Sequence, residues 1–177
     1  AESVQDGTTF TLGDGAQLRI IAAPGHTPGN LTAFVADSGD LYSGDTLLPD
    51  TFPTPGLHFP NVMAEPKTVR QTRWPSLPPF LDSVRQLSTL PVRRVFPGHG
   101  ETVDEPTQLF TRFERHHERR ARRIGTLLVQ RPDSAYGIAT RLSPHLPDAR
   151  VSQAMTEIIG HLDLLLQSGT ATVREDS

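Results

Sequence analysis

The stretch "AAPGHTPGNL", Ala22 to Leu31, places a single histidine, His26, between two Pro-Gly pairs. A similar pattern recurs in "VFPGHGET", where His99 lies between two glycines. In "LYSGDTLL", Asp45 directly follows a glycine. Glycine lets a chain turn sharply and approach a ligand closely, and proline reduces the entropy that such a turn loses on ordering. Each of the three residues follows a predicted strand, so we expect their side chains to meet at one edge of a sheet.

Imidazole and carboxylate groups are the ligands that zinc and related divalent metals take in proteins. The pattern therefore predicts a metal site made by His26, Asp45 and His99. Thr27 and Thr46 adjoin two of these residues and are candidates to hold them in place. A single histidine or aspartate beside glycine is more often an ordinary turn residue, but three such turns in this order favour a site.

Bulk properties exclude several classes of protein. The chain has 177 residues, a net charge of -3 and no cysteine. It therefore has no disulfide or cysteine-bound zinc, and no bulk attraction to nucleic acid or anionic membranes. No apolar run approaches the roughly 20 residues of a membrane span. We expect a cytoplasmic protein with neither a membrane nor a nucleic acid as partner.

Strand signals fill the first part of the chain. Residues 8–23 suggest two strands around a Gly-Asp-Gly turn, and residues 31–45 repeat the pattern around Asp37–Asp40. Residues 46–74 hold too many prolines for a helix or a central strand, which is typical of a functional loop. Residues 76–90 have the apolar spacing of a helix.

The composition changes after Pro106. Helical patterns cover residues 107–130, 134–142 and 149–173, the last closed by Gly169 as a C-cap before a strand-like tail. Three helices followed by a strand are typical of a winged helix. We therefore place one domain at residues 1–105 and a winged-helix-like domain at 106–177.

Arginines are frequent in the helix around residues 112–123, but glutamates interleave with them, as on a solvated face. The last helix carries an apolar stripe that predicts packing rather than DNA contacts. The stripe consists of Met155, Ile158, Ile159, Leu162, Leu165 and Leu166.

The motifs "GHTPG", "SGDTL" and "PGHG", in this order, resemble the last three metal motifs of the metallo-β-lactamase superfamily of hydrolases. The helical tail resembles the winged-helix appendage of one branch of it. The resemblance implies that His26 binds a first zinc ion, His99 a second, and Asp45 bridges both at the catalytic centre, although other divalent metals would also fit. A metal-bound hydroxide would then hydrolyse an ester, thioester, lactone or amide of a small-molecule substrate.

One family motif is missing, because the His-x-His-x-Asp-His cluster that precedes these motifs is not in the chain. The chain begins about where the second half of the family's αββα sandwich begins. We therefore expect an α/β fold consisting of half a sandwich and the appendage. Each of two metals would then have two ligands, whereas catalytic zinc normally has three. The alternative is a single metal held by His26, Asp45 and His99 together. Further ligands would lie outside these residues.

Half a sandwich leaves one sheet face uncovered. Burial of apolar surface stabilises by roughly 25 cal/mol per Å², so several hundred Å² correspond to about 10 kcal/mol. We expect an upstream half of the fold or a second copy of the chain as partner. Apolar side chains of the first strands, Leu18, Ile20, Phe34 and Val35, should be unusually exposed.

Two other functions remain open from the sequence. The chain could be a non-catalytic interaction module with an incomplete metal site, or a nuclease of the same fold. His58, in the Pro-rich stretch, is a candidate substrate contact, although a histidine exposed to solvent in a loop is the more common case.

Overall fold

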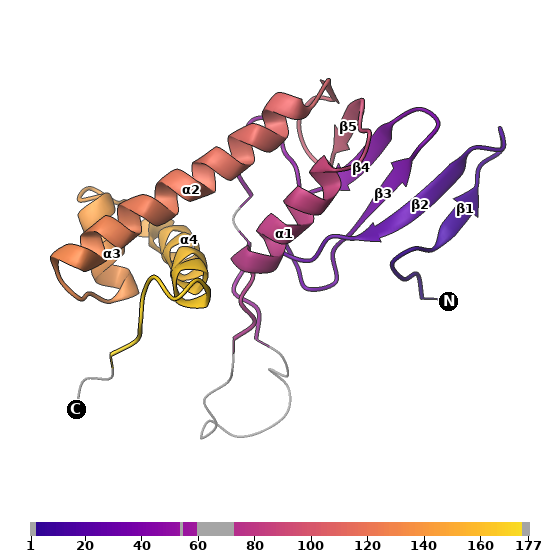
Figure 1. Cartoon of the computed structure of the whole chain (residues 1–177). Helices are drawn as coiled ribbons and strands as arrows, with labels where there is room; N and C mark the ends of the chain where they lie inside the picture. Colours follow the sequence, from indigo (N-terminus) through magenta and orange to yellow (C-terminus); the bar gives the residue numbers. More distant parts are fainter. Residues whose placement is uncertain (1–2, 54, 60–72, 175–177) are drawn as a thin grey trace.

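The computed structural model describes residues 3–53, 55–59 and 73–174 (Figure 1). These residues form one six-stranded sheet and four helices. The elements are β1 (Thr9–Thr11), β2 (Gln17–Ala22), β3 (Leu31–Val35), β4 (Asp40–Gly44), α1 (Leu77–Ser88), β5 (Arg94–Pro97), β6 (Val103–Asp104), α2 (Thr107–Gln130), α3 (Ala135–Leu142) and α4 (Asp148–Gln167).

The strands lie side by side in chain order, β1 to β6. All neighbours are antiparallel except β4 and β5, which are parallel. Parallel neighbours need a long crossover, and α1 lies within the one that connects them. Both predicted strand pairs are confirmed, and Gly39 has the positive φ of 74° that the second turn requires.

One face of the sheet packs against the helices. Ile21, Phe34, Leu41 and Val95 occupy paired or alternate positions on this face and are at most 5% exposed. They share a core with the predicted apolar face of α1 and with the first half of α2. The helical members are Leu77, Phe80, Leu81, Val84, Leu87, Leu109, Phe110 and Phe113.

The opposite face, here called the outer sheet face, carries apolar side chains that no described helix covers. The pairing of the strands assigns these residues to the outer sheet face: Phe10, Leu18, Ile20, Leu31, Ala33, Tyr42 and Phe96. Phe10, Leu31 and Tyr42 are 40–45% exposed, and Tyr42 stacks on Phe96 with ring centroids 4.9 Å apart. The predicted uncovered face is therefore present.

The residues chosen from the sequence to mark that face were partly wrong. Phe34 points to the core because it is paired with Leu41, and only 5% of it is exposed. Val35 belongs to the outer sheet face by its pairing with Leu18, yet it is 6% exposed. Leu18 and Ile20 are half-buried. Alternation along a strand shows that two faces exist but not which one meets the helices.

The last three helices form at the predicted places. Figure 1 shows α2 running from the sheet to α3 and α4 at the far end of the molecule. Ile124 of α2 belongs to a second core with α3 and α4, whereas the first half of α2 belongs to the sheet core. Of the predicted stripe of α4, Ile158 and Leu165 are buried, Leu166 is 39% exposed, and the other three residues are half-buried. The boundary near residue 105 stays a prediction.

The predicted wing is not found in the described residues. Gly169 ends α4 with a φ of 70°, as predicted, but residues 170–174 contain no strand. The N–H of Ala171 donates instead to the carbonyl of Leu165 at the end of α4.

In the Pro-rich stretch, residues 46–53 and 55–59 contain no helix and no strand beyond an isolated bridge between His58 and Trp74. Residues 54 and 60–72 lie outside the described part. None of the described helices is both long and apolar enough to cross a membrane.

Candidate metal centre

The sheet topology brings three strand ends to one edge. Strands β2 and β4 run in the same direction because both are antiparallel to β3, and β5 is parallel to β4. Their carboxyl ends therefore point the same way, and His26, Asp45 and His99 lie on the loops that follow.

The three predicted side chains lie together, with Asp45 in the middle. Its Oδ2 is 3.5 Å from Nε2 of His26, and its Oδ1 is 3.5 Å from Nε2 of His99. Each carboxylate oxygen thus faces a different imidazole. The sequence predicted this grouping correctly, while the role of the residues as metal ligands stays a prediction.

The spacing suits a metal between each imidazole and the carboxylate. Zinc lies about 2.0–2.2 Å from nitrogen and oxygen ligands in tetrahedral sites, which puts two of its ligand atoms roughly 3.4 Å apart. The observed N···O distances of 3.5 Å match that separation, and they are long for a direct hydrogen bond. The residues present therefore fit a metal on each side of Asp45.

The same geometry disfavours one metal held by all three residues. Within the described residues, no group of three or more histidine, aspartate or glutamate side chains is placed to hold a metal ion. Nδ1 of His26 is buried and has no hydrogen-bond partner in that part of the chain. Each metal position has two ligands here, fewer than the three of a catalytic zinc site.

Gly98 allows the loop of His99 to approach Asp45. A Cβ atom at Gly98 would lie 2.5 Å from Oδ1 of Asp45 and 3.1 Å from the carbonyl carbon of Gly44. The N–H of Gly98 donates to the carbonyl of Gly44 at 2.8 Å. This approach requires glycine, which explains the Pro-Gly-His order in the sequence.

Two side chains that sequence reasoning missed support the turn of His26. Asn30 donates through Nδ2 to the carbonyl of Ala23 at 3.0 Å and to Oγ1 of Thr46 at 2.8 Å, which joins the His26 loop to the residue after Asp45. Ser83 of α1 donates to the carbonyl of Pro24 at 2.8 Å. Thr46 thus accepts from Asn30, while its suggested role in holding a metal ligand stays a prediction; Thr27 has an exposed side chain.

The arginine-rich helix has structural partners for part of its charge. Arg112 donates to the carbonyls of Leu48 and Pro49 and lies 5.4 Å above the ring of Phe52. Arg120 pairs with Glu157, and Arg122 with Glu118. Arg112 and Arg120 thus hold α2 against other segments, whereas the Arg122 pair lies within α2 on an exposed face.

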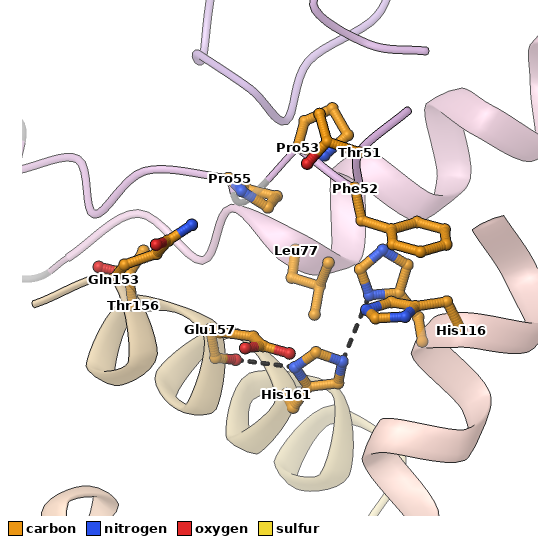
Figure 2. A pocket seen from close by; sticks show the side chains of 12 residues that line it. Thr51, Phe52, Pro53, Pro55, Leu77, His116, Gln153, Thr156, Glu157 and His161 are labelled. Atoms are coloured by element: carbon orange, nitrogen blue, oxygen red, sulfur yellow. Dashed lines mark hydrogen bonds between the residues drawn. The ribbon is translucent and has the colours of Figure 1, made fainter. Parts of the chain in front are cut away.

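A cavity of about 180 Å³ with both polar and apolar side chains lies between α2, α4, Leu77 and residues 51–53 and 55 (Figure 2). Nδ1 of His161 lies 2.7 Å from the carbonyl of Glu157, so this nitrogen donates. Nε2 of neutral His161 must then accept from Nδ1 of His117, 3.3 Å away. Burial lowers the pKa of His117 to about 3 and also lowers that of His161, so both rings are neutral. No group of three or more histidine, aspartate or glutamate side chains in this part of the described chain is placed to hold a metal ion.

Comparisons with known proteins agree with this architecture. The probable metallo-hydrolase YqjP of Bacillus subtilis (strain 168) is 28% identical over 146 residues, which are 82% of this chain and 44% of that protein. An atrochrysone carboxyl ACP thioesterase of Aspergillus fumigatus is 24% identical over 140 residues, 78% of this chain and 38% of that protein. The chain thus spans less than half the length of these relatives.

Among solved structures, a metallo-β-lactamase family protein from Thermus thermophilus superposes with a TM-score of 0.72 at 28% identity, over 94% of this chain and 49% of that one. The family model described as "Metallo-beta-lactamase superfamily" matches residues 1–99. More than half of the sequence, including all three strand-end residues, lies in that match, and the chain therefore belongs to the metallo-β-lactamase superfamily.

Proposed function

We propose that this chain is the metal-holding half of a metal-dependent hydrolase. The observation that carries the proposal is the placement of Asp45, whose two oxygens face the imidazoles of His26 and His99 at equal distances of 3.5 Å. The names of the relatives, a metallo-hydrolase and a thioesterase, support hydrolysis as the reaction class.

His26 and Asp45 would hold one zinc ion, and Asp45 and His99 a second. The metals, once bound, would lower the pKa of water so that it attacks the substrate at neutral pH. The chain's own contribution is to fix the carboxylate between two imidazoles. The hydrogen bond between Gly98 and Gly44 and the double contact of Asn30 hold the three loops together.

Among esters, thioesters, lactones and amides, a thioester is the substrate class to test first, because one relative is named a thioesterase. The other classes serve as comparisons, since the three described side chains at the centre do not select among them.

A second protein half would complete the site. The outer sheet face is apolar and exposed, and each metal position has two ligands among the described residues. We propose that an upstream half of the sandwich, or a second copy of the chain, covers this face and supplies the remaining ligands. The double length of the relatives supports the first partner. Helices α2–α4 would be the winged-helix appendage, although no strand of a wing occurs in residues 170–174.

Calorimetric titration with zinc tests the proposal. Asp45→Asn should abolish most of the zinc binding, because both metal positions share this carboxylate. Asp82→Asn is the matched control, since Asp82 is exposed on α1 and pairs only with Arg85 among the described residues. With the upstream half of the fold present, zinc-dependent hydrolysis of a model thioester should also disappear in Asp45→Asn. Unchanged zinc affinity or unchanged hydrolysis in that variant would refute the proposal.

A further inference from the structure

Three side chains hold the main chain around His26, two of them from other segments of the chain. Three of the carbonyls just after β2 accept side-chain hydrogen bonds: that of Ala23 from Asn30, that of Pro24 from Ser83, and that of His26 itself from His58. Asn30 belongs to the same loop and Ser83 to α1, but His58 comes from the Pro-rich stretch.

The contact of His58 has a defined direction. Its Nε2 lies 3.1 Å from the carbonyl oxygen of His26. A carbonyl can only accept, so Nε2 carries the proton and donates. His58 is half-buried, not a free loop residue.

His58 is itself fixed by its neighbours. The N–H of Trp74 donates to its carbonyl at 2.8 Å, and its ring lies 6.0 Å from the indole of Trp74. Ser76, at the start of α1, donates to the carbonyl of Gly56. A Cβ atom at Gly56 would lie 3.0 Å from Nε2 of His58, so glycine gives the imidazole room to reach His26.

We propose that His58 is a positioning residue for the metal ligand His26. This inference rests on the proposed function. By holding the carbonyl of His26, His58 limits rotation of the peptide plane that follows the Cα atom of the ligand. A metal ligand must be held within about 0.5 Å of its working position, and the backbone clamp contributes to that precision from a segment that carries no ligand.

Three variants test the proposal in the intact chain. His58→Leu removes the donor, and His58→Gln keeps an N–H donor close to the position of Nε2. His145→Leu is the matched control, because His145 is exposed and lies between α3 and α4. Two quantities are measured: zinc affinity by calorimetry, and hydrogen exchange of the Ala23 and Gly25 amides in the metal-free chain. These amides donate to the carbonyls of Asn30 and Thr27 within the same turn.

We expect His58→Leu to weaken zinc binding roughly tenfold, the lower end of the usual effect of groups that orient metal ligands, and to speed exchange of both amides. His58→Gln should keep most of the wild-type zinc affinity and most of the slow exchange of these amides. His145→Leu should change neither the affinity nor the exchange. Exchange of the α4 amides shows whether each variant is folded. The inference is overturned if His58→Leu leaves exchange and affinity unchanged, or if His58→Gln is as impaired as His58→Leu. Should the wild-type chain bind no zinc while His58→Leu still speeds exchange, the clamp on His26 holds and the proposed function fails.

Discussion

Substituting Gly98 by alanine should weaken zinc binding strongly while it lowers the free energy of unfolding only slightly. The added Cβ atom would lie 2.5 Å from Oδ1 of Asp45, where ordinary contact begins at 3.4 Å. The carboxylate oxygen, as the movable partner, must therefore shift by about 0.9 Å. Metal–ligand distances tolerate deviations of only about 0.2 Å, so the position shared by Asp45 and His99 should be lost.

The cost to folding should be smaller. The Cβ atom also meets the carbonyl carbon of Gly44 at 3.1 Å, which requires a movement of a few tenths of an ångström. Overpacking of this kind costs about 1–3 kcal/mol. Replacing glycine by alanine also stabilises the fold by about 0.4–1 kcal/mol, because it reduces the conformational entropy of the unfolded chain. We expect a net loss of roughly 1 kcal/mol in the free energy of unfolding, with zinc affinity reduced at least tenfold.

Zinc titration and urea unfolding of the wild type, Gly98→Ala and Gly29→Ala provide the measurement. Gly29 lies in the His26 loop, its φ is outside the positive range, and no described atom lies within 4 Å of an added Cβ, so its alanine variant should match the wild type in both assays. If Gly98→Ala bound zinc as tightly as Gly29→Ala, the argument that Asp45 and His99 share a metal would be refuted.

Three further outcomes follow from the same coordinates. Gly25→Ala should lower the free energy of unfolding by about 3 kcal/mol or more. Gly25 has a φ of 151°, and an added Cβ atom would lie 2.4 Å from backbone and side-chain atoms of Phe80. An unchanged urea midpoint would contradict this prediction. Tyr42→Lys should reduce self-association in sedimentation velocity, since Tyr42 lies on the outer sheet face at 44% exposure; unaltered association would argue against that face as an interface. Burial lowers the pKa of His117 from 6.5 to about 3, so the unfolded chain takes up the proton first and stability should fall from pH 6.5 toward pH 3, by at most about 1.4 kcal/mol per pH unit. His117→Asn should flatten the slope of urea stability between pH 6.5 and 5, and an identical slope would show that His117 does not titrate as its burial implies.

Local signals determined much of this protein. Gly39 and Gly169 occupy positive-φ positions that the sequence alone suggested, because a turn or a helix end restricts the backbone within a few residues. The apolar spacing within residues 76–90 predicted α1 for the same reason, since helical periodicity is a local property. Strand ends followed by Pro-Gly-His and Gly-Asp predicted the grouping around Asp45.

Tertiary structure decided what depends on distant segments. The contacts of Ser83 and His58 with the His26 turn join residues 59 and 32 positions apart, and no local pattern indicates which serine or histidine will reach a given carbonyl. The same reason applies to Phe34, which was expected to be exposed and lies in the core. Alternation divides a strand into two faces, but the position of α1 decides which face is covered. The sequence by itself determined which side chains form the candidate site and the edge where they meet. Packing between remote elements determined the contacts of the His26 turn, the close approach of Gly98 to Asp45, and the sheet face left open.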